Sequence, residues 1–174
     1  MYKIAIDLGY GYVKGMNEEK EKIIFPSIVG TAHDRALKDL FGTGVKNRLE
    51  NLWVRIKTGN LDNSFFVGNL AGDSISKSFI FDSNKIWHPN NIVLLGTAAA
   101  LLAPEGEDVL LVTGLPLEHF RMQRKEFSNF LKEYKAEIGF PGDMDLTRQI
   151  SFASSAIFPQ AAGALYEAVR ENPG

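Results

Sequence analysis

The stretch Asp7-Leu8-Gly9-Tyr10-Gly11-Tyr12-Val13-Lys14 decides how the first part of the chain folds. It completes an alternating apolar run, residues 2–8 (YKIAIDL), which predicts a strand ending at a glycine-rich turn. Residues 12–16 resume a strand pattern, and residues 22–26 (KIIFP) form a third candidate strand. Because the connections between these strands are short, the pattern indicates an antiparallel meander.

The same stretch carries groups that suit phosphate chemistry. Glycine lets backbone N–H groups approach an oxyanion closely and takes positive φ without strain, which makes Gly9 and Gly11 a candidate phosphate turn. Lys14 alternates with Tyr12 on one face of the second strand, where a cation can meet a phosphate. Asp7 lies close enough to hold a hydrated Mg²⁺ beside that phosphate. An ordinary glycine-rich hairpin remains the alternative interpretation, and the segment is not a Walker A loop.

Residues 27–84 have a different sequence pattern from the rest of the chain. Glycines break this stretch into short pieces, with a predicted helix near 33–41 and predicted strands near 52–58 and 64–70. The pattern indicates a small inserted lobe rather than a part of the main sheet.

After residue 84 the pattern alternates between helices and strands. The run 92–103 is apolar nearly all round, which is typical of a helix packed between other elements, and 108–113 (DVLLVT) reads as a central, doubly covered strand. The remaining predicted elements are a turn at 114–116, a helix over 117–138, a strand over 150–153 and a helix over 159–171. A meander joined to such units predicts an α/β fold with a mixed sheet and helices on its faces.

Composition excludes several classes of protein. Hydrophobic residues make up 45% and charged residues 23% of the 174 residues, which is ordinary for a folded domain. A net charge of −2 provides no bulk attraction to nucleic acid or anionic membrane. The absence of cysteine excludes disulfides and thiolate sites, and the three histidines lack a metal-ligand spacing. With no signal peptide and no apolar run long enough to span a bilayer, we expect a cytoplasmic protein without a membrane partner.

Three segments together resemble the actin and sugar-kinase superfamily. Residues 7–14 look like its first phosphate loop, in the form similar to the ParM and StbA plasmid-segregation branch and to archaeal actin-like proteins. Residues 113–117, with Arg124 and Lys125, resemble the strand-turn-helix in the middle of the first actin domain. Residues 158–166 resemble the helix that links the two actin domains, and residues 66–71 also resemble a segment of that branch.

The resemblance implies an RNase H-like fold, the first domain of an actin-like ATPase, with a mixed five-stranded sheet. Its core is expected in residues 1–26 and 85–174, and its inserted lobe in residues 27–84. It implies a site for ATP (or GTP) and Mg²⁺ in which Asp7 binds the metal through water. In that site Gln160 orients the attacking water, and the phosphates are held by Gly9, Tyr10, Gly11, Tyr12 and Lys14. Tyr10 departs from the Ser or Thr at comparable places in muscle-type actin and the sugar kinases.

The function implied is that of a filament-forming ATPase for plasmid segregation, whose partners are its own subunits and, through an adaptor protein, DNA. A second phosphate hairpin does not follow in the sequence, since Asp143-Met144-Asp145 leads into Leu146 and not glycine. We therefore expect an N-terminal half with the second ATPase domain absent, inactive alone. Two alternatives stay open: a domain of a sugar-kinase or chaperone-type ATPase, and a non-catalytic actin-like binding module.

Overall fold

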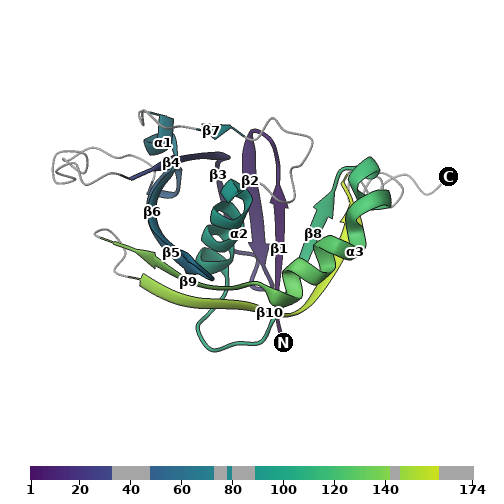
Figure 1. The fold of residues 1–174 in the computed structure, drawn as a ribbon. Coiled ribbons are helices and arrows are strands. Elements are labelled where there is room, and N and C mark those ends of the chain that lie inside the picture. The colour runs from purple at the N-terminus through teal and green to yellow at the C-terminus, as the bar shows by residue number, and fades with distance from the viewer. Residues whose placement is uncertain (33–47, 73–77, 80–88, 142–145, 161–174) are drawn as a thin grey trace.

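The computed structural model describes residues 1–32, 48–72, 78–79, 89–141 and 146–160 (Figure 1). The strands are β1 (Tyr2–Leu8), β2 (Tyr12–Asn17), β3 (Lys22–Pro26), β4 (Ile28–Thr31), β5 (Asn51–Thr58), β6 (Leu61–Gly68), β7 (Ser78–Phe79), β8 (Val109–Leu115), β9 (Lys135–Phe140) and β10 (Leu146–Pro159). The helices are a 3-10 turn (Arg48–Glu50), α1 (Asn69–Gly72), α2 (Pro89–Leu102) and α3 (Leu117–Glu133).

All the described strands join one mixed sheet in the order β3-β2-β1-β8-β10-β9-β5-β6-β4-β7. The meander β1–β2–β3 is antiparallel, whereas β8 runs parallel to both β1 and β10. These five strands form the predicted mixed sheet. The sheet then continues beyond the predicted five, because β10 also pairs antiparallel with β9, and β9 pairs with β5. Strand β9 and the four strands from residues 27–84 therefore extend the same sheet to ten strands.

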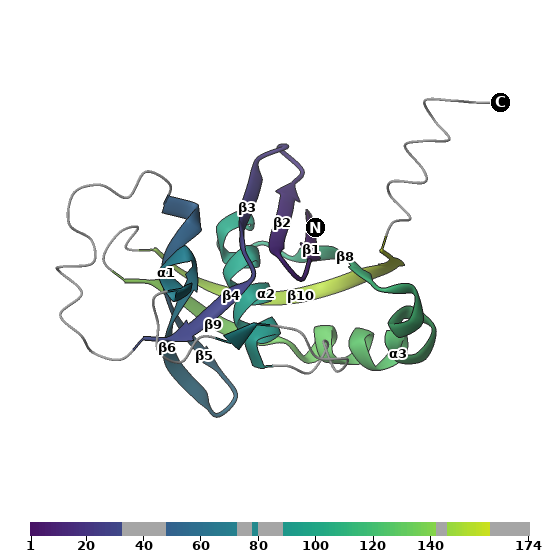
Figure 2. The same cartoon turned by 90° about the horizontal axis from the view of Figure 1, so that it is seen from above.

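The curved sheet wraps around α2, the central helix of the molecule (Figure 1). This helix contacts β1, β2 and β3 on one side and β9, β4 and β5 on the other, as the view from above also shows (Figure 2). Its enclosure explains why residues 93–100 are all buried and confirms the prediction of a helix packed between other elements. Gly96 leaves room for the Tyr134 hydroxyl, which donates a hydrogen bond of 3.0 Å to the Ile92 carbonyl, and burial raises the pKa of Tyr134.

A bulge in β10 changes which of its residues face the core. Ile150 and Phe152 face the core before the bulge, where the pairing register with β8 shifts between Phe152 and Ser154. After the shift, Ile157 packs against the same core. The extra residue changes which positions point inward, so a simple alternation does not describe this strand.

The prediction of one helix over 117–138 is wrong at its C-terminal end. Tyr134, with φ −63° and ψ 117°, leaves the helical conformation, and β9 follows directly. From there Ala136, Ile138 and Phe140 are buried in alternation, which is the period of a strand.

Three further boundaries differ from the predictions. Gly114 and Leu115 belong to β8 and do not form a turn, and the strand predicted at 150–153 spans 146–159. Pro159 ends β10 and does not begin a helix. The predicted helix near 33–41 and the predicted helical residues 161–171 lie outside the described residues. No helix in the described part of the chain is long and apolar enough to cross a membrane.

Candidate functional site

The parallel strands β1, β8 and β10 bring the two predicted catalytic residues to one edge of the sheet. Asp7 lies near the carboxyl end of β1, and Gln160 directly follows β10. Because parallel strands end at the same edge, the Gln160 Nε2 group reaches the Asp7 carboxylate and donates a hydrogen bond of 3.1 Å to Oδ1. Crevices at the carboxyl ends of parallel strands are the usual ligand sites of α/β sheets.

Gln160 is fixed in place by the neighbouring strand β8. Its backbone amide donates a hydrogen bond of 2.6 Å to the Leu115 carbonyl. Gly114 lies beneath its side chain, where an added Cβ would come within 3.1 Å of Gln160 Cγ. Sequence reasoning interpreted Gly114 as part of a turn and missed this role, because the contact depends on the pairing of β8 with β10.

The hairpin between β1 and β2 places the other predicted site residues beside Asp7. Lys14 lies opposite Asp7 in the pairing register. The Gly9 amide closes the hairpin with a hydrogen bond of 3.1 Å to the Tyr12 carbonyl. An added Cβ on Gly9 would lie 2.6 Å from that carbonyl oxygen, so only glycine permits the close approach.

The glycines of this hairpin do not use the positive φ that glycine permits. Among the described residues, the glycines with positive φ are Gly59, Gly68 and Gly106, and neither Gly9 nor Gly11 belongs to this group. An added Cβ on Gly11 would meet no atom within 4 Å. The fold therefore imposes no steric demand for glycine at position 11. Tyr10 and Tyr12, at 51% and 52% exposure, flank this open space.

Ser27 is a residue of the site that sequence reasoning did not single out. It lies between β3 and β4, is 1% exposed, and its hydroxyl donates a hydrogen bond of 2.8 Å to the Gly9 carbonyl. The Ser27 amide donates a second hydrogen bond, 3.0 Å long, to the Gly11 carbonyl. The available signal in the sequence was weak: a small polar residue directly after a predicted strand.

A wide groove adjoins these residues on the outer face of the sheet, which is the face turned away from α2. It has a volume of about 1080 Å³ and is lined by Asp7, Gly9, Lys14 and Gln160 at one end. Its apolar part includes Ala5, Met16, Ile24, Val112 and Phe158. The groove is large enough for a nucleotide-sized ligand, with Asp7, Lys14 and Gln160 at the hairpin end and Lys22 at the other.

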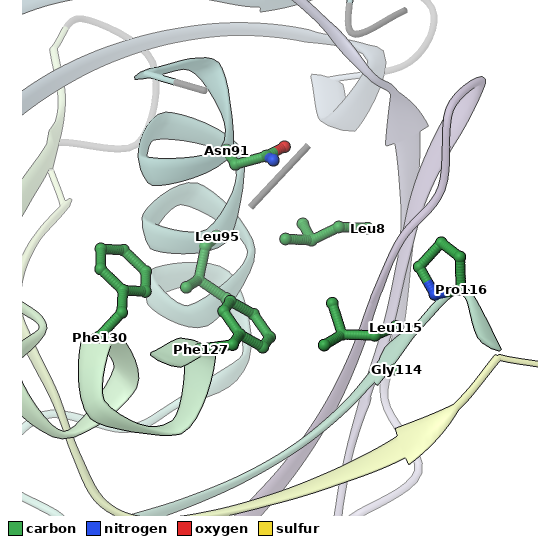
Figure 3. Close-up of a pocket in the computed structure, with 8 residues that line it drawn as sticks. All are labelled: Leu8, Asn91, Leu95, Gly114, Leu115, Pro116, Phe127 and Phe130. Atoms are coloured by element: carbon green, nitrogen blue, oxygen red, sulfur yellow. The ribbon is translucent and has the colours of Figure 1, made fainter. Parts of the chain in front are cut away.

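A second, smaller cavity lies on the inner face between α2 and α3 (Figure 3). Its volume is about 20 Å³, which is room for about one water molecule. The residues that line it include Leu8, Leu95, Leu115 and Phe127. Asn91 points toward it, and its buried Oδ1 has no hydrogen-bond partner in the described part of the structure. This cavity is too small for a nucleotide, so the outer groove is the candidate site.

The described residues contain no group of three or more His, Asp or Glu side chains that could hold a metal ion. Asp7 alone contributes a carboxylate at the hairpin, which agrees with Mg²⁺, an ion that commonly keeps several waters and takes one or two carboxylates together with phosphate oxygens. The site therefore fits a magnesium ion that arrives with a nucleotide better than a permanently bound metal.

Comparison with known proteins identifies relatives of this chain. The family model described as the N-terminal domain of actin-like proteins matches residues 5–163. The structure of a pCBH ParM non-polymerisable quadruple mutant is 40% identical, with a TM-score of 0.81 over 95% of this chain and 48% of that chain. A 15-stranded ParM filament from Clostridium botulinum is 39% identical, with a TM-score of 0.84 over 98% of this chain and 51% of that chain.

More distant structures share the fold alone. An archaeal actin homologue solved in complex with ADP is 18% identical, with a TM-score of 0.72 over 98% of this chain and 47% of that chain. No curated protein matches the sequence. The chain spans about half the length of the ParM proteins that it matches. With the family model covering residues 5–163 and 40% identity to a ParM protein, the chain belongs to the actin-like proteins and has the fold of their N-terminal domain.

Proposed function

We propose that this chain is the N-terminal half of a filament-forming ATPase that segregates plasmid DNA, and that it supplies one wall of the ATP site. The observation that carries the proposal is the hydrogen bond of 3.1 Å between Gln160 and Asp7, beside the hairpin that holds Lys14. Residues separated by 153 positions meet there and line the same nucleotide-sized groove. The 39% identity to a ParM protein that forms a 15-stranded filament supports the filament part of the proposal.

Each group has a proposed task that its chemistry suits. The backbone amides of residues 10–12 and the Lys14 ammonium bind the β- and γ-phosphates of ATP or GTP, while Gly9, whose own amide bonds to the Tyr12 carbonyl, shapes the turn that carries them. Asp7 binds Mg²⁺ through water, and the metal neutralises phosphate charge when bound. The Gln160 amide both donates and accepts hydrogen bonds, so it can orient a water molecule without being consumed. Its contact with Asp7 holds the amide at the site before a nucleotide arrives.

We propose the following division of labour along the chain. Residues 1–26 and 85–174 form the nucleotide-binding core, and residues 27–84 form a lobe that contacts the next subunit of a filament. A second domain supplies the opposite wall of the site. A cytoplasmic location and an adaptor protein that links the filament to DNA agree with the net charge of −2, which gives no direct attraction to nucleic acid.

Calorimetric titration with Mg–ATP tests the nucleotide site. The wild-type chain should bind weakly, because one wall leaves much of the nucleotide in water. Asp7→Ala should weaken binding about 10- to 100-fold, the range expected for losing a hydrogen bond to a charged group. Asp62→Ala removes an exposed carboxylate on β6, outside the groove, and should bind like wild type.

The outcomes separate the parts of the proposal. Absence of Mg–ATP binding to the wild-type chain would contradict the nucleotide site. Equal affinities of wild type and Asp7→Ala would contradict the role of Asp7. Tight binding with turnover would show that a second wall is not needed.

A further inference from the structure

Ser27 ties together two carbonyl groups of the β1–β2 hairpin. Its hydroxyl donates to the Gly9 carbonyl at 2.8 Å, and its amide donates to the Gly11 carbonyl at 3.0 Å. The residue is 1% exposed and is held between β3, which pairs with β2, and β4, which pairs with β6. The hairpin is thus braced from one side by the point at which the chain passes from β3 to β4.

These two bonds determine where the loop amides point. In a trans peptide the C=O of one residue and the N–H of the next point in opposite directions, and the described residues contain no cis peptide. With the Gly9 and Gly11 carbonyls turned toward Ser27, the N–H groups of Tyr10 and Tyr12 are turned away from it. Both peptide planes are therefore oriented by one buried side chain and its own amide.

Neighbouring contacts limit the other conformations that the loop between β1 and β2 can adopt. The Gly9 amide is occupied by the Tyr12 carbonyl at 3.1 Å, and the 2.6 Å between that oxygen and a Cβ built on Gly9 shows how narrow the turn is. A part-buried carbonyl without a hydrogen bond is costly, so removing the Ser27 hydroxyl favours rotation of the Gly9–Tyr10 peptide toward another donor. Such a rotation would also redirect the Tyr10 amide.

We propose that Ser27 is a positioning residue for nucleotide phosphates, which orients the Tyr10 and Tyr12 amides before the ligand binds. This inference rests on the proposed nucleotide site and names the residue that shapes it. Amides that already point at the place of negative charge need no reorganisation on binding, which is the source of their contribution to affinity. The ligand class is a magnesium-bound di- or triphosphate.

Backbone amide NMR of the whole chain tests the proposal, with Mg–ATP and magnesium-bound inorganic triphosphate as probes. In the wild type, both probes should shift the Tyr10 and Tyr12 amide resonances. Ser27→Ala should raise the concentration needed for half-maximal shift about tenfold, as expected for a lost hydrogen bond. Ser27→Cys keeps the shape with a weaker donor and should show an effect in the same direction, so it carries the test if the alanine variant does not fold.

Thr97→Val is the matched control. Thr97 is 0% exposed, and its hydroxyl also donates to a backbone carbonyl, that of Val93, at 2.7 Å, but it lies within α2. This variant should lower the melting temperature without changing the response of residues 10 and 12 to either probe. If Ser27 served stability alone, Ser27→Ala would likewise lower the melting temperature and leave the response of residues 10 and 12 unchanged.

Two results would overturn the inference, and they are distinguishable. If wild type and folded Ser27 variants respond to both probes at equal concentrations, Ser27 does not position the loop, while the nucleotide site stands. If the wild type itself responds to neither probe, the nucleotide site fails and the role of Ser27 fails with it.

Discussion

Neighbouring residues of β1 face opposite environments. Ile4, Ile6 and Leu8 are at most 7% exposed and face α2, whereas Asp7 is exposed on the other side of the same strand. The outer face itself changes along the sheet. Across β5, β6 and β9 it carries ion pairs such as Lys57–Glu137 at 2.8 Å, but across β1, β2, β3 and β8 it forms the largely apolar groove.

This difference shows how one strand can serve stability and ligand binding at once. Alternation assigns every second residue to the core, where packing leaves no freedom. The outward positions carry few packing constraints, so a carboxylate at position 7 and a lysine at position 14 cost the fold little. We expect inward changes to affect the free energy of unfolding and outward changes to affect ligand binding.

Adjacent residues of β8 give the largest expected difference. Leu111 is 0% exposed on the inner face, and Leu111→Ala should lower the free energy of unfolding by about 2–5 kcal/mol through lost contacts and a cavity. Val112 is half-buried on the outer face, and Val112→Ala should cost less, about 1 kcal/mol. Urea denaturation of both variants measures the difference, and equal costs would contradict the division between the two faces.

The regular elements were predictable where one periodicity dominated. The strand over residues 2–8, the strand over 22–26 and the buried helix after residue 88 follow the apolar pattern closely. The helix predicted over 117–138 extended too far because Phe127, Leu131, Tyr134 and Ile138 keep a helical spacing across the end of α3. The part of β10 after residue 153 was missed because the bulge interrupts the alternation.

The hairpin side of the candidate site was predictable from the residue pattern, whereas Gln160 was predictable from resemblance alone. Asp7 was selected from the strand-turn pattern and again as a family position, and its contact with Gln160 follows from the parallel pairing of β1, β8 and β10. Their roles stay predictions. Ser27 and Gly114 were missed because their contacts join distant segments through backbone atoms, which leave no periodic signal in the sequence.

Gly11 and Gly15 test the same division between packed and open positions within one hairpin. An added Cβ on Gly15 would lie 2.6 Å from Leu102 Cδ1 and 3.2 Å from the Ala5 carbonyl, so Gly15→Ala should lower the free energy of unfolding by about 1–3 kcal/mol. On Gly11 the same methyl group meets no atom within 4 Å, so Gly11→Ala should change stability by no more than about 0.5 kcal/mol. Thermal and urea denaturation provide the measurements.

The pair is its own control, because both substitutions restrict the unfolded chain equally. Gly11→Ala should instead weaken Mg–ATP binding, since the new methyl group occupies the open space beside the loop. Unchanged binding together with lost stability in Gly11→Ala would reverse the assignment of the two glycines.

The smallest expected effect concerns the charged part of the outer face. A hydrogen bond from Arg55 lowers the pKa of Asp62, and hydrogen bonds from Lys57 and Gln149 lower the pKa of Glu137. A carboxyl whose pKa is lower in the folded state stabilises the fold above its unfolded pKa, near 4, and loses this contribution as the pH falls through the folded value. The effect is small because these groups are exposed and screened by water.

The double variant Asp62→Asn, Glu137→Gln should therefore show a shallower loss of stability between pH 5 and pH 2 than the wild type, measured by urea denaturation at low salt. High salt should reduce the difference, because exposed pairs are screened within about 10 Å at 0.1 M ionic strength. An unchanged pH dependence would mean that these ion pairs do not stabilise the outer face. The outer face of β5, β6 and β9 would then differ from the groove only in how well water solvates it. In that case the two parts of the outer face would differ in ligand binding and not in their contribution to stability.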